Sequence, residues 1–404
     1  MKYIFLTFFS LLIIFEGKSD DLRTVDLVQA FDNVQEIFLS DFVESIEYIV
    51  LESHGAIRVH NSYITKTYSN DNFFISIDWR QICLFDRQTG KFNRTIGALG
   101  SDGFISAGFF DSNTQSVVAN GSLTELVEYN LYGVQTRRIV KPPKEFLSIE
   151  RFFETQFGSL RCRLIDDNTV AYYVNNTFGD AKERIQVADV NGSILKTFNN
   201  PNRFVRERED VASFRPPVFY QHDKNLFIFT ESCVDTIFRV TKDSLMPHYH
   251  LKMGRYKRPC ERLSNDQNFE FNNLGENEHF LFFNFSCCRD SFPSFDIFEK
   301  GHLVRPTIPP QKNFFGYYDK KSGTTRIARE GMIINDIDNF SAVQLVSWTI
   351  NTERNELISI IHARDIVDWF EKNPEEAKNL PERLQKLSGL NSGDNPVVVV
   401  AKLK

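Results

Sequence analysis

The chain has 404 residues, of which 42% are hydrophobic and 25% are charged, a composition that is ordinary for a globular protein and excludes wholesale disorder. Its 47 basic and 53 acidic residues give a net charge of −6 without a long basic run, so nucleic-acid binding through phosphates has no electrostatic basis. Aromatic residues reach 14%, with 39 phenylalanines, which favours strands over helices.

The first residues have the pattern of an export signal. Lys2 supplies a positive charge, residues 4–15 form an apolar run too short to span a bilayer comfortably, and small residues follow. We therefore predict a signal peptide over residues 1–19, a mature protein that begins near Asp20, and no membrane-embedded segment. No cysteine precedes Cys83, so the run is not followed by a residue that could carry a lipid.

The sequence carries no recognisable catalytic or metal-binding motif. Its six cysteines are scattered, with no Cys-x-x-Cys pair, and we expect buried or free thiols with room for one bridge. Gly-x-Ser-x-Gly, HExxH and EF-hand patterns are not found. We therefore predict no catalytic residue, no metal ligand and no cofactor.

A strand–turn–strand unit recurs along the chain. It first occurs at residues 72–97 as NFFISID, QICLFDRQTG and KFNRTIG, and later copies begin at 115, 168, 225 and 279. The same corner of the unit is marked in four copies by Gly90, Gly133, Gly192 and Gly323. Repeats of about 40–50 residues are typical of four-stranded propeller blades.

We therefore predict an all-β fold, a six-bladed β-propeller with four-stranded blades, over residues 20–404. The innermost strand of a blade would lie just upstream of each repeat, for example at residues 57–65 or 218–222. In the last blade, residues 344–350 would form the second strand and residues 397–403 the third.

The two ends of the chain complete this ring. Residues 46–51 alternate like a strand, and a second strand at 397–403 runs almost to the last residue. If residues 46–51 form the outermost strand of the last blade, the two ends pair and protect edges that would otherwise be exposed.

One helical segment interrupts the strands, at about residues 365–387. Asn373-Pro374-Glu375-Glu376 is a helix-start signal, and Gly389 ends the segment. We predict two short helices inserted between the second and third strands of the last blade. They would sit over one mouth of the central channel, either as padding of the ring or as a functional lid.

Several segments resemble the six-bladed β-propeller proteins that are abundant in Bacteroidetes: FLSDFVESIEYIVLES, RTIGALGSDG, DTIFRV, YYDKKSG, INDID and GDNPVVVVAKLK. The resemblance covers nearly all of the mature chain. It implies an exported protein, often a lipoprotein, of a family often encoded beside TonB-dependent outer-membrane transporters and carbohydrate-uptake proteins. The chain departs from the family in lacking the lipoprotein cysteine, and in lacking a common Pro-Gly-Glu within residues 97–103.

Two short patterns have a structural and a functional interpretation. Gly97, Gly100 and Gly103 follow a strand but precede no helix, so a turn between blades is favoured over a phosphate site. His248 and His250 share one side of a strand, which is compatible with a metal site, but no third ligand is evident nearby, so exposed strand histidines are favoured.

The loops that join second to third strands are the predicted ligand-binding surface. They contribute Asp78, Trp79, Arg80, Asn120, Asn175, Asn176, Asp180, Glu231, Asp235, Arg289 and Asp290. Polar groups mixed with aromatic rings suit a sugar or a peptide. Turns are polar in most proteins, so a purely structural interpretation stays open.

We therefore predict an exported, non-enzymatic, monomeric propeller that is soluble in the periplasm or at the cell surface. It would bind a glycan, a peptide or a protein partner of an outer-membrane uptake system. The alternative is a lactonase-, hydrolase- or lyase-like propeller enzyme with a metal in its channel. Acids or histidines that converge from several blades would favour the enzyme, and a flat aromatic and polar surface would favour the binding protein.

Overall fold

A computed structural model of the protein describes residues between 22 and 404, with gaps. The described residues are 22–53, 66–77, 81–98, 108–122, 124–142, 161–176, 179–204, 217–230, 233–260, 268–287, 298–299, 302–303, 312–343, 345 and 347–404. The predicted signal peptide lies outside them and stays a prediction.

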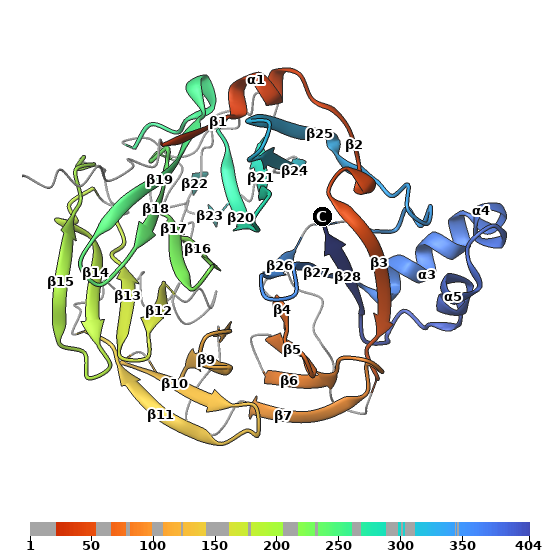
Figure 1. Cartoon of the computed structure of the whole chain (residues 1–404), viewed down its shortest axis with the longest axis horizontal. Coiled ribbons are helices and arrows are strands. Elements are labelled where there is room, and N and C mark those ends of the chain that lie inside the picture. Colours follow the sequence, from red (N-terminus) through yellow and green to blue (C-terminus); the bar gives the residue numbers. More distant parts are fainter. Residues whose placement is uncertain are drawn as a thin grey trace, which may run out of the picture.

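Small sheets, in which consecutive strands are antiparallel, lie in a ring around a central axis, which makes the fold propeller-like (Figure 1). One sheet contains β4 (Lys66–Ser69), β5 (Phe73–Ile77), β6 (Gln81–Asp86) and β7 (Phe92–Ala98). The next contains β8 (Gly108–Asp111), β9 (Ser116–Asn120), β10 (Glu125–Asn130) and β11 (Gln135–Val140). A third contains β12 (Cys162–Asp166), β13 (Thr169–Tyr173), β14 (Glu183–Asp189) and β15 (Ile194–Asn199).

The ring continues through the second half of the chain. The following sheet contains β16 (Val218–His222), β17 (Asn225–Phe229), β18 (Thr236–Val240) and β19 (Leu245–Lys252). Its neighbour contains β20 (Glu270–Glu276), β21 (Phe280–Cys287), β24 (Lys312–Asp319) and β25 (Thr324–Ile334), and β22 (Phe298–Glu299) pairs with β23 (His302–Leu303) apart from it. The last contains β26 (Trp348–Asn351), β27 (Glu356–Ile361), β28 (Val397–Leu403) and β3 (Val43–Val50).

The predicted corner glycines have the backbone that a hairpin turn requires. Their φ angles are +69° at Gly90, +84° at Gly133, +83° at Gly192 and +70° at Gly323. In the first of these turns, the carboxylate of Asp86 accepts hydrogen bonds from the backbone of Gln88 and Thr89. The sequence specifies these hairpins locally, which is why the repeat could be recognised.

The predicted closure of the ring is confirmed. β28 lies between β27 and β3, and it pairs with β3 in antiparallel register from Val397 opposite Val50 to Leu403 opposite Val43. Both faces of β28 are buried, because alternate valines enter two different hydrophobic clusters. The C-terminal strand is thus a central strand of its sheet, and the N-terminal part of the chain supplies the outer one.

Two strand assignments from the sequence differ from the structure. The innermost strand of the first sheet is β4, downstream of residues 57–65, which lie outside the described residues. Residues 344–350 are not a second strand, because β26 begins only at Trp348 and is innermost, and β27 takes the second place. A turn in which Asn355 has a φ of +51° reverses the chain between them. The predicted strand at residues 218–222 is confirmed as β16.

The helical insertion lies between β27 and β28, as predicted, but not over the channel. It consists of α3 (Ala363–Lys372), α4 (Pro374–Lys378), α5 (Glu382–Gln385) and the 3-10 turn η4 (Lys386–Gly389), three helices where two were expected. Figure 1 shows α3, α4 and α5 beyond β3, on the outside of the ring. Their apolar side chains, such as Ile366 and Trp369, are buried in one cluster with Phe340. Because this apolar face needs cover, the segment packs against the rim.

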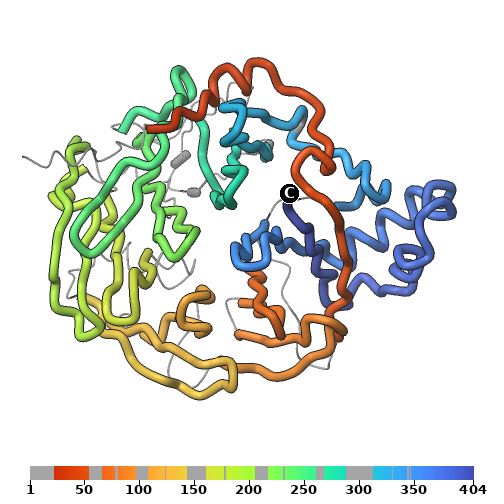
Figure 2. The backbone as a smooth tube through the Cα atoms, viewed as in Figure 1, coloured from red at the N-terminus to blue at the C-terminus, as the bar shows by residue number. Residues whose placement is uncertain are grey.

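The N-terminal segment wraps around the outside of neighbouring sheets. β1 (Arg23–Asp26) pairs in parallel with β19, α1 (Leu27–Asp32) follows, and β2 (Gln35–Phe38) pairs in parallel with β25. After η1 (Leu39–Asp41) the chain enters β3, so one continuous belt joins three sheets (Figure 2). Two sheets therefore have five strands instead of the four expected. None of the helices in the described residues, including η3 (Gly254–Tyr256), is long and apolar enough to cross a membrane.

Candidate functional site: the central channel

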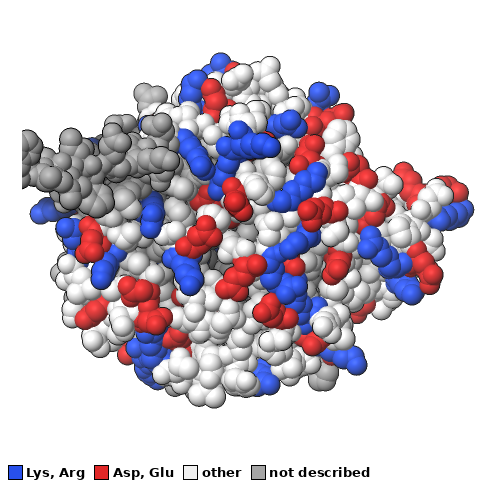
Figure 3. All heavy atoms as spheres, viewed as in Figure 1, with Lys and Arg blue, Asp and Glu red and all other residues white. Residues whose placement is uncertain are grey.

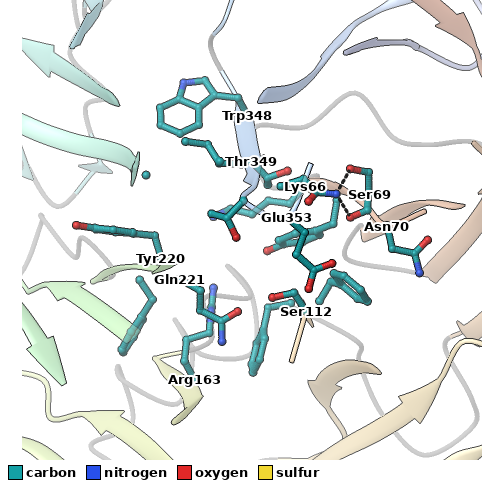
Figure 4. Close-up of a pocket in the computed structure, with 18 of the residues that line it drawn as sticks. Lys66, Ser69, Asn70, Ser112, Arg163, Tyr220, Gln221, Trp348, Thr349 and Glu353 are labelled. Carbon is teal, nitrogen blue, oxygen red and sulfur yellow. Dashed lines mark hydrogen bonds between the residues drawn. The ribbon is translucent and has the colours of Figure 1, made fainter. Parts of the chain in front are cut away.

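The innermost strands surround a cavity of about 90 Å³ on the axis of the ring. Each of β4, β8, β12, β16, β20 and β26 contributes to its lining, together with the turns that follow β4, β8 and β26. Figure 4 shows labelled side chains from different strands directed toward this common space. A cavity of this size holds several water molecules or one small organic group.

Hydrogen bonds between sheets fix the positions of the innermost strands. The Thr349 hydroxyl donates to the Thr67 carbonyl at 2.6 Å. Asn351 Nδ2 donates to the carbonyl of Ser69 at 3.0 Å (Figure 4). On the other side of β26, Asn273 Nδ2 donates to the Trp348 carbonyl at 2.6 Å. On this side of the channel, the innermost strands β4, β26 and β20 are therefore bonded to one another, and their side chains are held by a rigid scaffold.

Aromatic rings and polar groups share the lining of the cavity. The rings come from Tyr68, Phe109, Phe110, Phe219, Tyr220 and Trp348. Among the polar side chains are Ser112 and Gln221. Such a mixture offers flat apolar surfaces and hydrogen-bonding groups to one ligand.

Two cationic side chains also line the cavity. The Arg163 guanidinium lies 4.3 Å from the ring centre of Phe109 and 5.4 Å from that of Phe219, and its Nη1 donates to the Cys162 carbonyl. Lys66 lies on β4 and is half-buried at the wall of the cavity. Burial, with the charge of Arg163 added, lowers the pKa of Lys66 to about 8. Burial also lowers the pKa of Arg163.

Negative charge is sparse around these two cations. Of the residues that line the cavity, Glu353 carries the one carboxylate, and it is exposed in the turn after β26. Asp111 attracts Arg163 electrostatically and accepts a hydrogen bond from the Asn113 backbone at 2.9 Å. Burial, with a contribution from Glu128, raises the pKa of Asp111. Among the described residues, no carboxylate forms an ion pair with Lys66 or Arg163.

The predicted ligand-binding residues lie away from this cavity or outside the described residues. Outside them are Asp78, Trp79, Arg80, Glu231, Arg289 and Asp290. The described ones are Asn120, Asn175, Asn176, Asp180 and Asp235, none of which lines the channel cavity. Their proposed role in binding is therefore still a prediction.

Three of these residues make structural contacts. Asn176 is buried, and its amide donates to the Asn202 carbonyl at 2.8 Å. Asp235 forms a 2.7 Å ion pair with Lys257. Asn120 accepts a 3.0 Å hydrogen bond from Lys141 Nζ. These contacts stabilise loops and strand ends, as the structural interpretation of the polar loops expects.

The two histidines of β19 bind different carboxylates. His248 Nε2 lies 2.8 Å from Glu276, and His250 Nε2 lies 3.7 Å from Asp235. Within the described residues, no group of three or more His, Cys, Asp or Glu side chains is placed to hold a metal ion. Of the three spaced glycines, Gly97 lies in β7, and the other two are outside the described residues.

Two of the cysteines are bonded to each other, and charges of both signs are mixed on one face of the molecule (Figure 3). Cys233 and Cys260 form a disulfide, whereas Cys83, Cys162 and Cys287 are buried. On the face in Figure 3, lysines and arginines alternate with acidic residues over the described part of the surface. This face therefore has no extended field of one sign.

Sequence reasoning missed Lys66 and Arg163, although a signal was present. In strands flanked by hydrophobic residues, a lysine or arginine is rarely buried unless it is paired. Arg163 stands in such a strand, between Cys162 and Leu164. The sequence predicts the innermost strand of the first sheet at residues 57–65, just upstream of Lys66, and so does not assign Lys66 to the channel.

The ring of small sheets around a lined channel defines an all-β protein of propeller type. The chain belongs to the family described as domain of unknown function DUF4934, whose model matches residues 22–402. A crystal structure of a predicted exported protein from Bacteroides fragilis is similar, with 15% identity and a TM-score of 0.64 over 92% of this chain and 98% of that one. No curated protein matches the sequence significantly.

More distant structures match less well. An oligogalacturonate lyase in complex with manganese has 12% identity and a TM-score of 0.36, over 85% of this chain and 77% of that one. A chain of the mitotic checkpoint complex has 8% identity and a TM-score of 0.40, over 78% of this chain and 76% of that one. Likenesses this weak do not bear on function.

Proposed function

We propose that the protein is an exported, non-enzymatic binding protein that holds the end of a glycan in its central channel. The observation that supports this most is the composition of the cavity wall. Every large sheet contributes its innermost strand, and the wall combines aromatic rings with hydroxyl and amide groups. A sugar presents apolar C–H faces and a rim of hydroxyls, which such a wall complements.

The sheet order supports a count of six blades. Each sheet of four or five strands has one strand at the channel and one at the rim, and the pair β22–β23 falls in the chain between the second and third strands of its sheet. On this count β1 and β2 are additions to the outside of two blades.

Export to the periplasm or the cell surface has three supports. The first residues have the pattern of a signal peptide, over residues 1–19. Cys233 and Cys260 form a disulfide, which persists in oxidising compartments. The similar Bacteroides fragilis protein is itself a predicted exported protein.

The loops between second and third strands are proposed as a second contact surface. A glycan longer than one sugar, or a peptide or protein partner of an uptake system, would extend from the channel over such loops. Asn175 is partly exposed there and Asp180 is exposed.

The proposal is tested by blocking the channel. Ser112 and Thr352 lie in turns that border the cavity, so Ser112→Trp and Thr352→Trp should fill its mouth without disturbing the sheets. A glycan array followed by calorimetry on the hits should give binding for the natural protein and at least tenfold weaker binding for both variants.

The matched control is Thr197→Trp on the exposed outer strand β15. This variant should bind as the natural protein does. If the hits bind equally well to all four proteins, the channel is not the binding site. If no glycan binds, the proposed ligand class is wrong.

A further inference from the structure

Lys66 and Arg163 form an uncompensated cationic pair in the channel. They lie on β4 and β12, on two sheets that are not adjacent in the ring, and both face the cavity (Figure 4). Their charges repel each other. Neither has an ion-pair partner among the described residues.

Aromatic contacts hold Arg163 in place, but no carboxylate among the described residues forms an ion pair with it. The rings of Phe109 and Phe219 flank its guanidinium and favour a cation through their π electrons. One guanidinium N–H group donates to the Cys162 carbonyl, which leaves donors directed at the cavity. Lys66 has no comparable aromatic or carbonyl contact among the described residues.

The nearby carboxylates do not neutralise the pair. Asp111 is turned toward the Asn113 backbone and Gln221, and burial disfavours its charge. Glu353 is exposed to solvent at the cavity mouth. Two half-buried cations without an ion-pair partner destabilise a protein, and such groups commonly mark a functional site.

We propose that the channel ligand is an acidic sugar, whose carboxylate binds between Lys66 and Arg163. This inference rests on the proposed function, since it names the chemical class of the glycan held in the channel. The planar guanidinium matches a carboxylate through paired hydrogen bonds, and the ammonium adds a point charge. The sugar ring then lies against the aromatic wall, to which Tyr68 and Tyr220 contribute.

Calorimetry with D-glucuronate, and with D-glucose as its neutral counterpart, tests the inference. We expect glucuronate to bind and glucose to bind at least thirtyfold more weakly. Lys66→Met and Arg163→Met should each weaken glucuronate binding by at least thirtyfold. Lys66→Arg, which keeps the charge, should lose less. Circular dichroism on each variant checks that the ring is folded.

Lys196→Met is the matched control, because Lys196 is exposed on β15, away from the channel. It should leave glucuronate binding unchanged. Acetate and sulfate, as free anions, should compete only at concentrations at least tenfold above glucuronate. Equal competition would overturn the sugar and leave a plain anion site. Tighter binding of N-acetyl-aspartate amide than of glucuronate would also overturn it, in favour of an acidic peptide.

The outcome for glucose separates this inference from the proposed function. If glucose and glucuronate bind equally, and Ser112→Trp abolishes both, the channel binds sugars but the anionic class is wrong. If neither sugar nor any larger uronic-acid oligomer binds, the acidic-sugar inference fails, and the proposed function fails as well only if no glycan on the array binds.

Discussion

Single residues in the channel carry a charge at the expense of stability. Lys66 is the clearest case, because burial and the charge of Arg163 lower its pKa from 10.5 to about 8. In the unfolded chain the Lys66 amine keeps its proton up to a higher pH. At neutral pH the charged amine is therefore less favourable in the folded protein than in the unfolded chain, which lowers the free energy of unfolding.

Lys66→Met should therefore stabilise the ligand-free protein. At pH 7 the free energy of unfolding should rise by up to about 3 kcal/mol, which is the shift of the pKa expressed as energy. The natural protein gains stability as the pH rises from about 8 to 10.5, because the unfolded chain then holds the extra proton, so the advantage of the variant should shrink there.

Urea unfolding at pH 7 and pH 10 measures this difference, with Lys196→Met as a neutral control. A variant less stable than the natural protein at pH 7 would mean that the Lys66 charge has a stabilising partner, and would remove the basis for an anion site.

Glu276 has the opposite role, that of a satisfied buried charge. Burial alone would raise its pKa, but the hydrogen bond with His248 and the ion pair with Lys320 prevail and lower it to about 2. Because the pKa is lower than in the unfolded chain, its contribution is complete above about pH 4.5 and is lost as the pH falls toward 2.

Glu276→Gln should therefore lower the free energy of unfolding at pH 7 by about 3 kcal/mol, since it leaves Lys320 buried without its partner. The difference from the natural protein should narrow between pH 4.5 and pH 2. Glu375→Gln, in an exposed pair with Lys378, should change stability by less than about 0.5 kcal/mol. An equal effect of the two substitutions at pH 7 would contradict the role of Glu276.

Substitutions of two corner glycines should distinguish the energetic cost of an unfavourable backbone conformation from the cost of steric crowding. Gly323→Ala requires a φ of +70° but meets nothing closer than 3.9 Å, so it should cost about 1 kcal/mol. Gly90→Ala has the same conformational cost and also places Cβ 2.0 Å from the Val50 carbonyl oxygen, which should add at least about 2 kcal/mol. Thermal unfolding compares them, and equal losses would mean that β3 does not press on this corner.

At the scale of elements, local hairpins were predictable and their assembly was not. The strands β5, β6 and β7 follow directly from alternation and an Asp-to-Gly turn. The apolar stretch before β26 resembles a strand equally well, and only pairing with β27 decides that the strand starts at Trp348. The helices α3 to α5 were placed correctly in the chain, but the side of the ring on which they pack depends on a cluster with Phe340.

The closing strand should be indispensable. A chain that ends at Asn395 loses β28, the strand that lies between β27 and β3. Without β28, both neighbouring strands have open edges. We expect no cooperative unfolding transition by circular dichroism, and partial recovery when a peptide of residues 396–404 is added. A soluble monomer with an unchanged melting temperature would contradict the closure of the ring by its two ends.

At the scale of the whole molecule, the ring brings together residues that no local pattern connects. Lys66 and Arg163 line the same cavity only because two innermost strands face the same axis, although the two residues lie far apart in the sequence. Sequence reasoning therefore found the class of fold but looked for the site on polar loops, where polarity is expected in any case. The channel exists because the ring is closed, and the ring is closed by the pairing of β28 with β3.

The central claim is that this channel binds the anionic end of a ligand. A crystal structure of the protein soaked in sodium glucuronate tests it most directly. We predict density for one sugar in the cavity, with its carboxylate within 3.2 Å of Lys66 Nζ and of the Arg163 guanidinium, the reach of a hydrogen bond. Density only on the outer loops or the rim, with the two cations facing an empty channel at saturating ligand, would contradict the account.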